Sequence, residues 1–251
     1  MKQIQTMIIA LIAMVAISTS VHAGSFGFGV TGALMSVDAS GTETEGTAAE
    51  TGSKSASAGN NAYIGSIFAE YTFDGMAGMT IGVDYIPGSA DVNSKTQQRS
   101  DTVTSVEDTE TTTALTEVRK ANASVENHIT YYAELPIHSS GLFFKLGYVE
   151  MDVNSDESGG SNAGSYGNKT VDGTTVGLGI KQEVSDSLFI KVLAQRTEFD
   201  GFTLNETGQT SESVANSIKV DGIETSKASL AIGYKFELIL EHFKKLNPLI
   251  Y

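Results

Sequence analysis

The three histidines outside the first 23 residues are the side chains best suited to acid–base or metal chemistry, but they are scattered. His128 lies in an alternating segment, His138 in a turn-like stretch and His242 near the end of the chain. Metal sites need ligands that meet on one face, and nothing in this spacing brings these three together. The chain also has no cysteine, which removes thiolate chemistry and zinc–thiolate sites. We therefore expect no catalytic residue, no cofactor and no enzyme activity.

One acidic segment has part of the spacing of a calcium-binding loop. In DVNSDESGG, the residues Asp152, Asn154 and Asp156 occupy the first, third and fifth positions. Glu157 replaces the glycine of the sixth position, and Ala163 replaces the glutamate of the twelfth. These departures favour a solvated acidic loop, and the three residues are only weak candidates for metal ligands.

The first 23 residues predict export. Lys2 precedes an apolar run from Met7 to Ile17, and Val21 and Ala23 are the short residues that a signal peptidase reads, so cleavage before Gly24 is expected. As a helix, this run would rise only about 16 Å, which is too short for a hydrocarbon layer of about 30 Å. The formal charge is −14, and removal of Lys2 leaves −15. A polyanion repels nucleic acid, so nucleic-acid binding is excluded.

The rest of the chain follows a two-residue period, in which apolar and polar side chains alternate over segments of about ten residues. Short and long connections alternate strictly between the segments. This alternation is typical of a membrane barrel with short periplasmic turns and long extracellular loops, whereas a Greek-key sandwich has no reason to follow it. The segments are Ser25–Val37, Tyr63–Phe73, Met79–Ile86, Val125–Leu135, Leu142–Met151, Thr174–Val184, Leu188–Gln195 and Lys227–Phe236.

The segments predict an all-β fold, an eight-stranded antiparallel up-and-down transmembrane β-barrel over residues 24–236. Residues 1–23 form the predicted cleaved signal peptide and residues 237–251 a C-terminal periplasmic extension. In that extension Ile239, Phe243, Leu246 and Ile250 have helical spacing, which leaves open an interfacial helix or a frayed tail. The long connection from Asn93 to Asn122 also alternates in part, and forms either a hairpin arm or a disordered tip.

The two faces of the segments differ in a way that predicts which one meets lipid. One face carries Phe, Leu, Ile, Val, Ala and Tyr, and the other carries Gly, Ser, Thr and charged residues. Because buried charges must be paired, a near-equal number of acids and bases predicts an ion-pair network in the lumen. A soluble barrel would reverse the two faces, so a soluble exported β-barrel or sandwich is a distant alternative. The predicted lumen residues are Glu70, Asp84, Glu126, His128, Glu134, Lys145, Lys181, Glu183, Lys191, Lys227 and Lys235.

The leader, the eight segments and the final KASLAIGYKF resemble the small eight-stranded outer-membrane barrels, the OmpA transmembrane domain and OmpX-like superfamily. The resemblance implies a location in the bacterial outer membrane and contact with its lipids. It also implies biogenesis through periplasmic chaperones and the barrel-assembly machinery. That machinery reads a lipid-facing last strand, here Leu230, Ile232, Tyr234 and Phe236. Such proteins usually end at the terminal aromatic, whereas this chain continues to Tyr251, and the peptidoglycan-binding domain of OmpA-type proteins is absent.

The first functional hypothesis is a non-enzymatic membrane protein with a structural or surface-interaction role through its long acidic loops. The extracellular partner is not identified by the sequence. The alternative is a narrow porin-like channel for ions or small solutes, running through a charged, hydrated lumen.

Overall fold

The computed structural model describes residues 24–46, 51–74, 77–91, 97–105, 113–158, 165–207 and 216–237. The predicted signal peptide and residues 238–251 of the predicted extension lie outside the described residues. These described ranges contain ten strands: β1 (Gly24–Gly46), β2 (Thr51–Phe73), β3 (Thr80–Asp91), β4 (Gln97–Ser105), β5 (Thr113–Pro136), β6 (Leu142–Ser158), β7 (Asn168–Glu183), β8 (Leu188–Phe199), β9 (Phe202–Asn205) and β10 (Ser217–Glu237).

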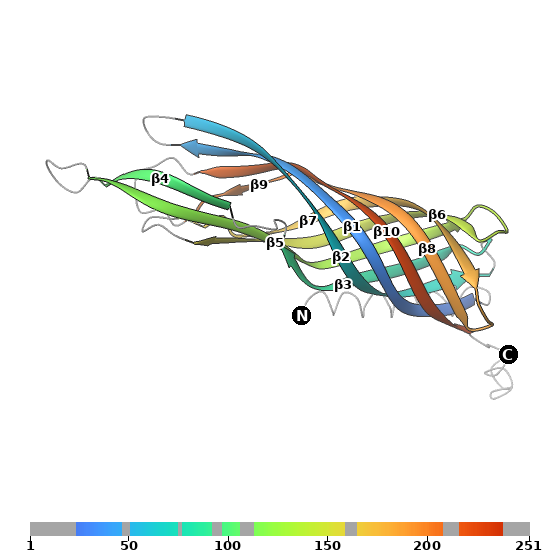
Figure 1. Ribbon diagram of the computed structural model, residues 1–251. Coiled ribbons are helices and arrows are strands. Elements are labelled where there is room, and N and C mark those ends of the chain that lie inside the picture. Colours follow the sequence, from blue (N-terminus) through green and yellow to red (C-terminus); the bar gives the residue numbers. More distant parts are fainter. Residues whose placement is uncertain are drawn as a thin grey trace, which may run out of the picture.

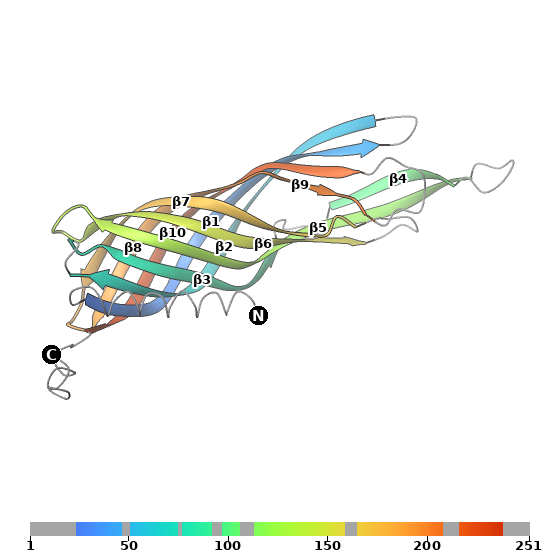
Figure 2. The ribbon, with the colours of Figure 1, turned by 180° about the vertical axis from the view of Figure 1, so that it is seen from behind.

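Eight of these strands form a closed ring. Their order is β1-β2-β3-β5-β6-β7-β8-β10, and β1 also pairs with β10 (Figures 1 and 2). Every neighbouring pair is antiparallel. The two remaining strands are additions, because β4 pairs with β5 and β9 pairs with β10. The predicted eight-stranded antiparallel barrel is therefore confirmed. No helix among the described residues is long and apolar enough to span a bilayer.

The ring strands continue well beyond the predicted segments. β1 and β2 pair over their full length, from Gly24 opposite Phe73 to Gly46 opposite Thr51. A strand of 23 residues reaches about 75 Å at roughly 3.3 Å per residue, against an apolar band of about 25 Å in such barrels. The Thr- and Ser-rich residues after Val37 have no apolar face, so their sequence did not predict a strand. Their backbone groups nevertheless continue the hydrogen-bonded pairing of β1 with β2.

Two hairpins therefore project from the same end of the barrel, β1–β2 and β4–β5 (Figure 1). β4 pairs with β5 from Gln97 opposite Ala121 to Ser105 opposite Thr113, so the long connection from Asn93 to Asn122 contains a hairpin arm. The other end carries the short turns between β2 and β3, β5 and β6, and β7 and β8.

The seam between β2 and β3 is the shortest in the ring. Only six residue pairs join the two strands, from Ile67 opposite Tyr85 to Thr72 opposite Thr80. Beyond this seam β3 follows β5, and its residue Pro87 has no N–H to donate to a ladder. The β1–β2 hairpin and the β4–β5 hairpin diverge from this point (Figure 2).

A β-bulge on β5 reverses two of the predicted orientations. The register of β5 against β6 shifts between Glu126 and Ile129, and Asn127 has a φ of 55°. Residues before the bulge therefore point to the face opposite to the one that simple alternation predicts. Val125, predicted to face lipid, packs in the barrel interior. Glu126, predicted to face the lumen, lies on the outer face, opposite Asp152, where its carboxylate accepts a hydrogen bond from the Asn154 amide.

The outer face of the ring carries the apolar band. The members named below are exposed although they are large and apolar, as expected for a surface in contact with lipid hydrocarbon, whereas Val83 and Ile129 on the same face are buried. The predicted assembly strand lies on this face, and its role in assembly stays a prediction. Members of the band include Phe28, Val30, Leu34, Tyr63, Leu146, Val176, Leu178, Ile180, Val192, Leu230, Ile232, Tyr234 and Phe236.

We predict that the Asn127 bulge tolerates glycine and resists a β-branched residue. A left-handed backbone is open to glycine but costs valine about 1–2 kcal/mol, whereas in a regular strand valine would be favoured over glycine. The free energy of unfolding of Asn127→Val and Asn127→Gly is compared by urea titration, read by the gel mobility of unheated protein because the chain lacks tryptophan. A valine variant as stable as the glycine variant would contradict the bulge.

Candidate functional site

The half of the lumen nearer the short-turn end is built around Glu70 of β2, whose side chain is 1% exposed. Its carboxylate accepts hydrogen bonds from the ammonium groups of Lys181, at 3.2 Å, and Lys191. It also accepts one from the Tyr132 hydroxyl at 2.9 Å. Lys191 in turn donates to Glu134 at 2.7 Å. Strands β2, β5, β7 and β8 are thereby tied across the lumen, and the two acids and two bases of this network balance in charge.

Aromatic rings fill the space around these charges, and glycines on neighbouring strands make room for them. A Cβ on Gly82 would lie 2.4 Å from the Tyr132 ring, and one on Gly233 would lie 2.2 Å from the Phe189 ring. The rings also receive the lysines, since Lys145 Nζ is 3.9 Å from the centre of the Tyr132 ring. Cation–π contacts of this kind gain strength when water is excluded. Glycines inside the barrel therefore leave the space that the aromatic rings occupy.

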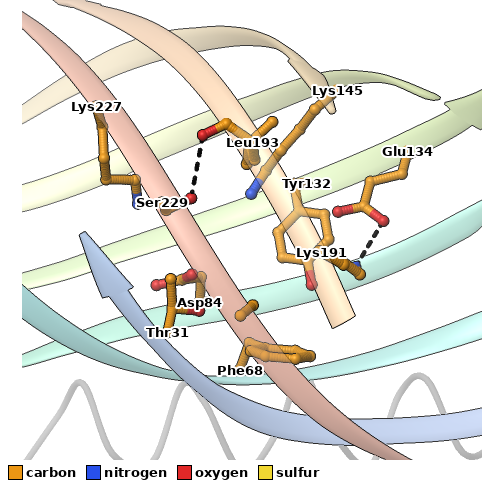
Figure 3. Close-up of a pocket in the computed structure, with 11 residues that line it drawn as sticks. Thr31, Phe68, Asp84, Tyr132, Glu134, Lys145, Lys191, Leu193, Lys227 and Ser229 are labelled. Carbon is orange, nitrogen blue, oxygen red and sulfur yellow. Dashed lines mark hydrogen bonds and ion pairs between the residues drawn. The ribbon is translucent and has the colours of Figure 1, made fainter. Parts of the chain in front are cut away.

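Toward the long-loop end, a second group of buried charges surrounds a small cavity. Asp84 of β3, Lys145 of β6 and Lys227 of β10 are at most 6% exposed, and all three line the cavity together with Lys191 and Glu134 (Figure 3). The cavity measures about 20 Å³. A cavity needs roughly 10–15 Å³ to hold one water molecule, so this cavity has room for a water molecule or a small ion.

Further toward the long-loop end, the lumen contains a hydrophobic cluster. Six buried side chains from β6, β7, β8 and β10 form one hydrophobic cluster, and Val37, Ala39, Val125, Phe202 and Val220 pack against it. We call the six residues the apolar layer: Val149, Met151, Val153, Val171, Phe199 and Ile223. His128 lies at the border between the charged groups and this layer, with its ring 6.2 Å from that of Phe199 and its Nδ1 atom buried without a hydrogen-bond partner in the described structure.

The structure thus divides the predicted lumen residues among several separate groups. Glu70, Glu134, Lys181 and Lys191 form one network. Asp84, Lys145 and Lys227 join the cavity, and His128 borders the apolar layer. Glu183 and Lys235 pair with each other at 3.3 Å near the short-turn end, where both are partly exposed. Glu126 lies on the outer face, as described above.

The weak metal candidates do not form a loop. Asp152 and Asn154 lie on the outer face of β6 and Asp156 continues the same strand, where its backbone pairs with Asn122. Asp152 instead accepts hydrogen bonds from Asn127 at 2.9 Å and Thr170 at 2.7 Å. Across the described ranges no group of three His, Cys, Asp or Glu residues is placed to hold a metal ion.

The apolar layer and two of the interior rings were missed by sequence reasoning. The apolar layer reaches residues beyond the predicted ends of several segments, such as Val153, Val171, Phe199 and Ile223. Phe68 and Phe189 occupy inward positions of the alternation, so the two-residue period did contain the signal for them. Phe68 and Phe189 were missed because the inward face was assumed to be polar.

An acidic belt crosses the outer face just beyond the apolar band on six of the eight ring strands, β1, β5, β6, β7, β8 and β10, and we call it the acidic collar. Like charges lie directly opposite one another in it, as in the pairs Asp38–Glu224, Glu224–Glu198 and Glu150–Asp172. Arg196 bridges two of its members, at 3.2 Å from Glu198 and 2.7 Å from Glu224. Carboxylates at this level mark the end of the lipid-facing surface. The collar consists of Asp38, Glu126, Glu150, Asp152, Asp172, Glu198 and Glu224.

Comparison with known proteins agrees with this architecture. The model of the outer membrane protein beta-barrel domain family matches residues 7–236. The chain belongs to this family. The barrel is therefore an outer-membrane β-barrel of the bacterial envelope, with its short turns expected at the periplasmic side. No curated protein matches its sequence.

Solved structures similar to this outer-membrane barrel share little sequence with it. Neisserial surface protein A is 13% identical over 81% of this chain and 97% of its own, with a TM-score of 0.35. OprG from Pseudomonas aeruginosa is 12% identical over 86% and 97%, with a TM-score of 0.46. The outer membrane protease OmpT from Escherichia coli is 10% identical over 84% and 97%, with a TM-score of 0.44.

We predict that the Glu70 network stabilises the barrel far more than the exposed Glu183–Lys235 pair. Glu70→Gln removes the carboxylate shared by two lysines and should cost about 3 kcal/mol, because it leaves buried charge uncompensated. Glu183→Gln is the matched control and should cost less than about 1 kcal/mol, since its pair is partly exposed. Urea titration of both refolded variants gives their free energies of unfolding. Equal losses of stability would contradict the larger contribution expected of Glu70.

Proposed function

We propose that this outer-membrane barrel is a closed, non-conducting and non-enzymatic scaffold that presents its projecting hairpins for interaction at the cell surface. The filling of the lumen carries the proposal. The Glu70 network with its surrounding rings, the Asp84 group at the cavity and the apolar layer succeed one another along the barrel axis. At eight strands a barrel is just wide enough for side chains to fill it.

The apolar layer argues most directly against the channel alternative. An ion passing through the barrel would leave water at a level lined by Val149, Met151 and Phe199, with no polar side chain of that cluster to replace its hydration. Transfer of a charge from water into an apolar environment of this kind costs many kcal/mol. The charged groups below the layer are themselves engaged in ion pairs or confined around a cavity of about 20 Å³.

The absence of enzyme activity is supported by where the histidines lie. His128 is inside the barrel, against Phe199, and His138 lies in the short turn after β5. A histidine beside the acids of the long-loop rim would be one signature of hydrolytic chemistry there, and these two histidines occupy other levels.

The projecting hairpins supply the surface that the scaffold presents. β1 and β2 form a ladder that extends past the acidic collar, and in the described residues the β2 edge before Ile67 pairs with no strand other than β1. Free strand edges accept extended polypeptide segments through backbone hydrogen bonds. The carboxylates of the collar and the net charge of −14 favour a basic partner over an acidic one.

We predict that the refolded barrel gives no steady current in planar lipid bilayers. The expected trace stays at the level of protein-free bilayers, because neither the apolar layer nor the Glu70 network leaves a hydrated path. Correct insertion is checked in the same preparation by heat-modifiable gel mobility, and a wide porin in the same bilayers controls for sensitivity. Steady ion-selective steps from the inserted protein would favour the channel.

We predict that the tip of the β1–β2 projection can be removed without loss of barrel stability. Residues 45–52 are replaced by Asn-Gly, which joins Thr44 and Ser53 at a point where they already pair and keeps the whole β1–β10 seam. The unfolding midpoint should stay within experimental error, since the apolar band and the lumen are unchanged. Gly29→Val is the contrasting control, because its Cβ would meet the Ile232 carbonyl at 2.2 Å and prevent folding. A large drop in the trimmed barrel would mean that the hairpin supports the fold.

A further inference from the structure

The buried charges in and next to the small cavity do not balance. The Glu70 network is neutral, with Glu70 and Glu134 against Lys181 and Lys191. The group around the cavity holds one carboxylate, Asp84, and two further lysines, Lys145 and Lys227. Over these seven side chains the lysines exceed the carboxylates by one, and an uncompensated buried charge is costly. Glu206 is also buried but does not line the cavity.

The excess charge is localised at the cavity. Lys145 and Lys227 are 3% and 6% exposed, and within the described part of the chain no carboxylate oxygen lies within 4.0 Å of either ammonium nitrogen. One oxygen of Asp84 is buried without a hydrogen-bond partner. Figure 3 shows Lys145, Lys227 and Asp84 entering the same space from three strands. Two lysines, and a carboxylate that can offset only one of them, therefore line one small pocket.

We propose that this cavity binds a single small monovalent anion, of the size of chloride or bromide, between the ammonium groups of Lys145 and Lys227. The bound anion brings the charge of the Asp84 group to zero and accepts hydrogen bonds from the two ammonium groups. The volume of about 20 Å³ selects for size. A monatomic halide is compact enough for this space, whereas large organic anions such as gluconate are disfavoured by their size.

This site does not depend on the proposed surface function. A closed scaffold needs no anion to present its hairpins, and a conducting barrel would still face the same excess charge. The anion acts here as a structural part of the lumen, completing the layer between the Glu70 network and the apolar layer.

The first test uses the stability of the refolded full-length barrel in different sodium salts. At about 100 mM and matched ionic strength, chloride and bromide should lower the unfolding equilibrium constant at least tenfold relative to gluconate, as expected for a site with a dissociation constant near 10 mM. Lys227→Met removes the excess charge and should abolish the halide dependence. Lys235→Met, from the partly exposed pair with Glu183, is the matched control and should retain it.

A second measurement keeps the proposal testable if Lys227→Met fails to fold. Crystals of the unaltered protein grown in bromide should show an anomalous peak between Lys145 and Lys227. A peak together with halide-dependent stability supports the site. A peak without any effect on stability means an adventitious ion only and overturns the proposal. Absence of both means that the cavity holds water and that one lysine is neutral, which also overturns it.

Discussion

The pairing of β1 with β10 is the constraint on which the rest of the structure depends. In lipid every backbone donor and acceptor must find a partner, and a sheet satisfies this only by closing on itself. The two strands run in register from Ser25 opposite Glu237 to Thr44 opposite Ser217, with one irregularity after Ser40. Closure separates an outer face from a lumen, so each residue of a ring strand is committed to lipid or to the interior. The apolar band, the buried charges and the projecting hairpins all follow from that separation.

The two-residue period made this separation readable from the sequence. It predicted eight strands, their antiparallel order and the outward orientation of residues such as Leu230 and Tyr234, because lipid on one side imposes a uniform apolar requirement. It also placed Glu70, Glu134 and Lys191 on one face. It could not predict that they meet, since Glu70 and Lys191 are 121 residues apart and their contact depends on the curvature of the closed ring.

The failures have equally specific causes. The bulge at Asn127 inserts a residue into β5, and an insertion of one residue exchanges the faces of everything before it. Glu126 and Val125 were misplaced for that reason. Asparagine adopts a left-handed backbone more readily than most residues, but Asn127 alone does not specify a bulge within a regular alternation. The apolar layer was missed because it lies where the outer face has already become polar, at the level of Glu150 and Asp172. There the alternation is inverted, with apolar side chains inside and acids outside.

That inversion divides each ring strand into two parts with different solvents. Within the apolar band, lipid lies outside, so charges can be accommodated only in the lumen, where the narrow ring lets Lys191 reach carboxylates on β2 and β5. Beyond the band, water lies outside, so acids gather on the surface and hydrophobic side chains fill the lumen, as in a soluble barrel. The ladder remains intact across the change because it uses only backbone groups. A barrel of eight strands can therefore extend far past the membrane as one continuous sheet, provided that its side-chain pattern inverts at the membrane boundary.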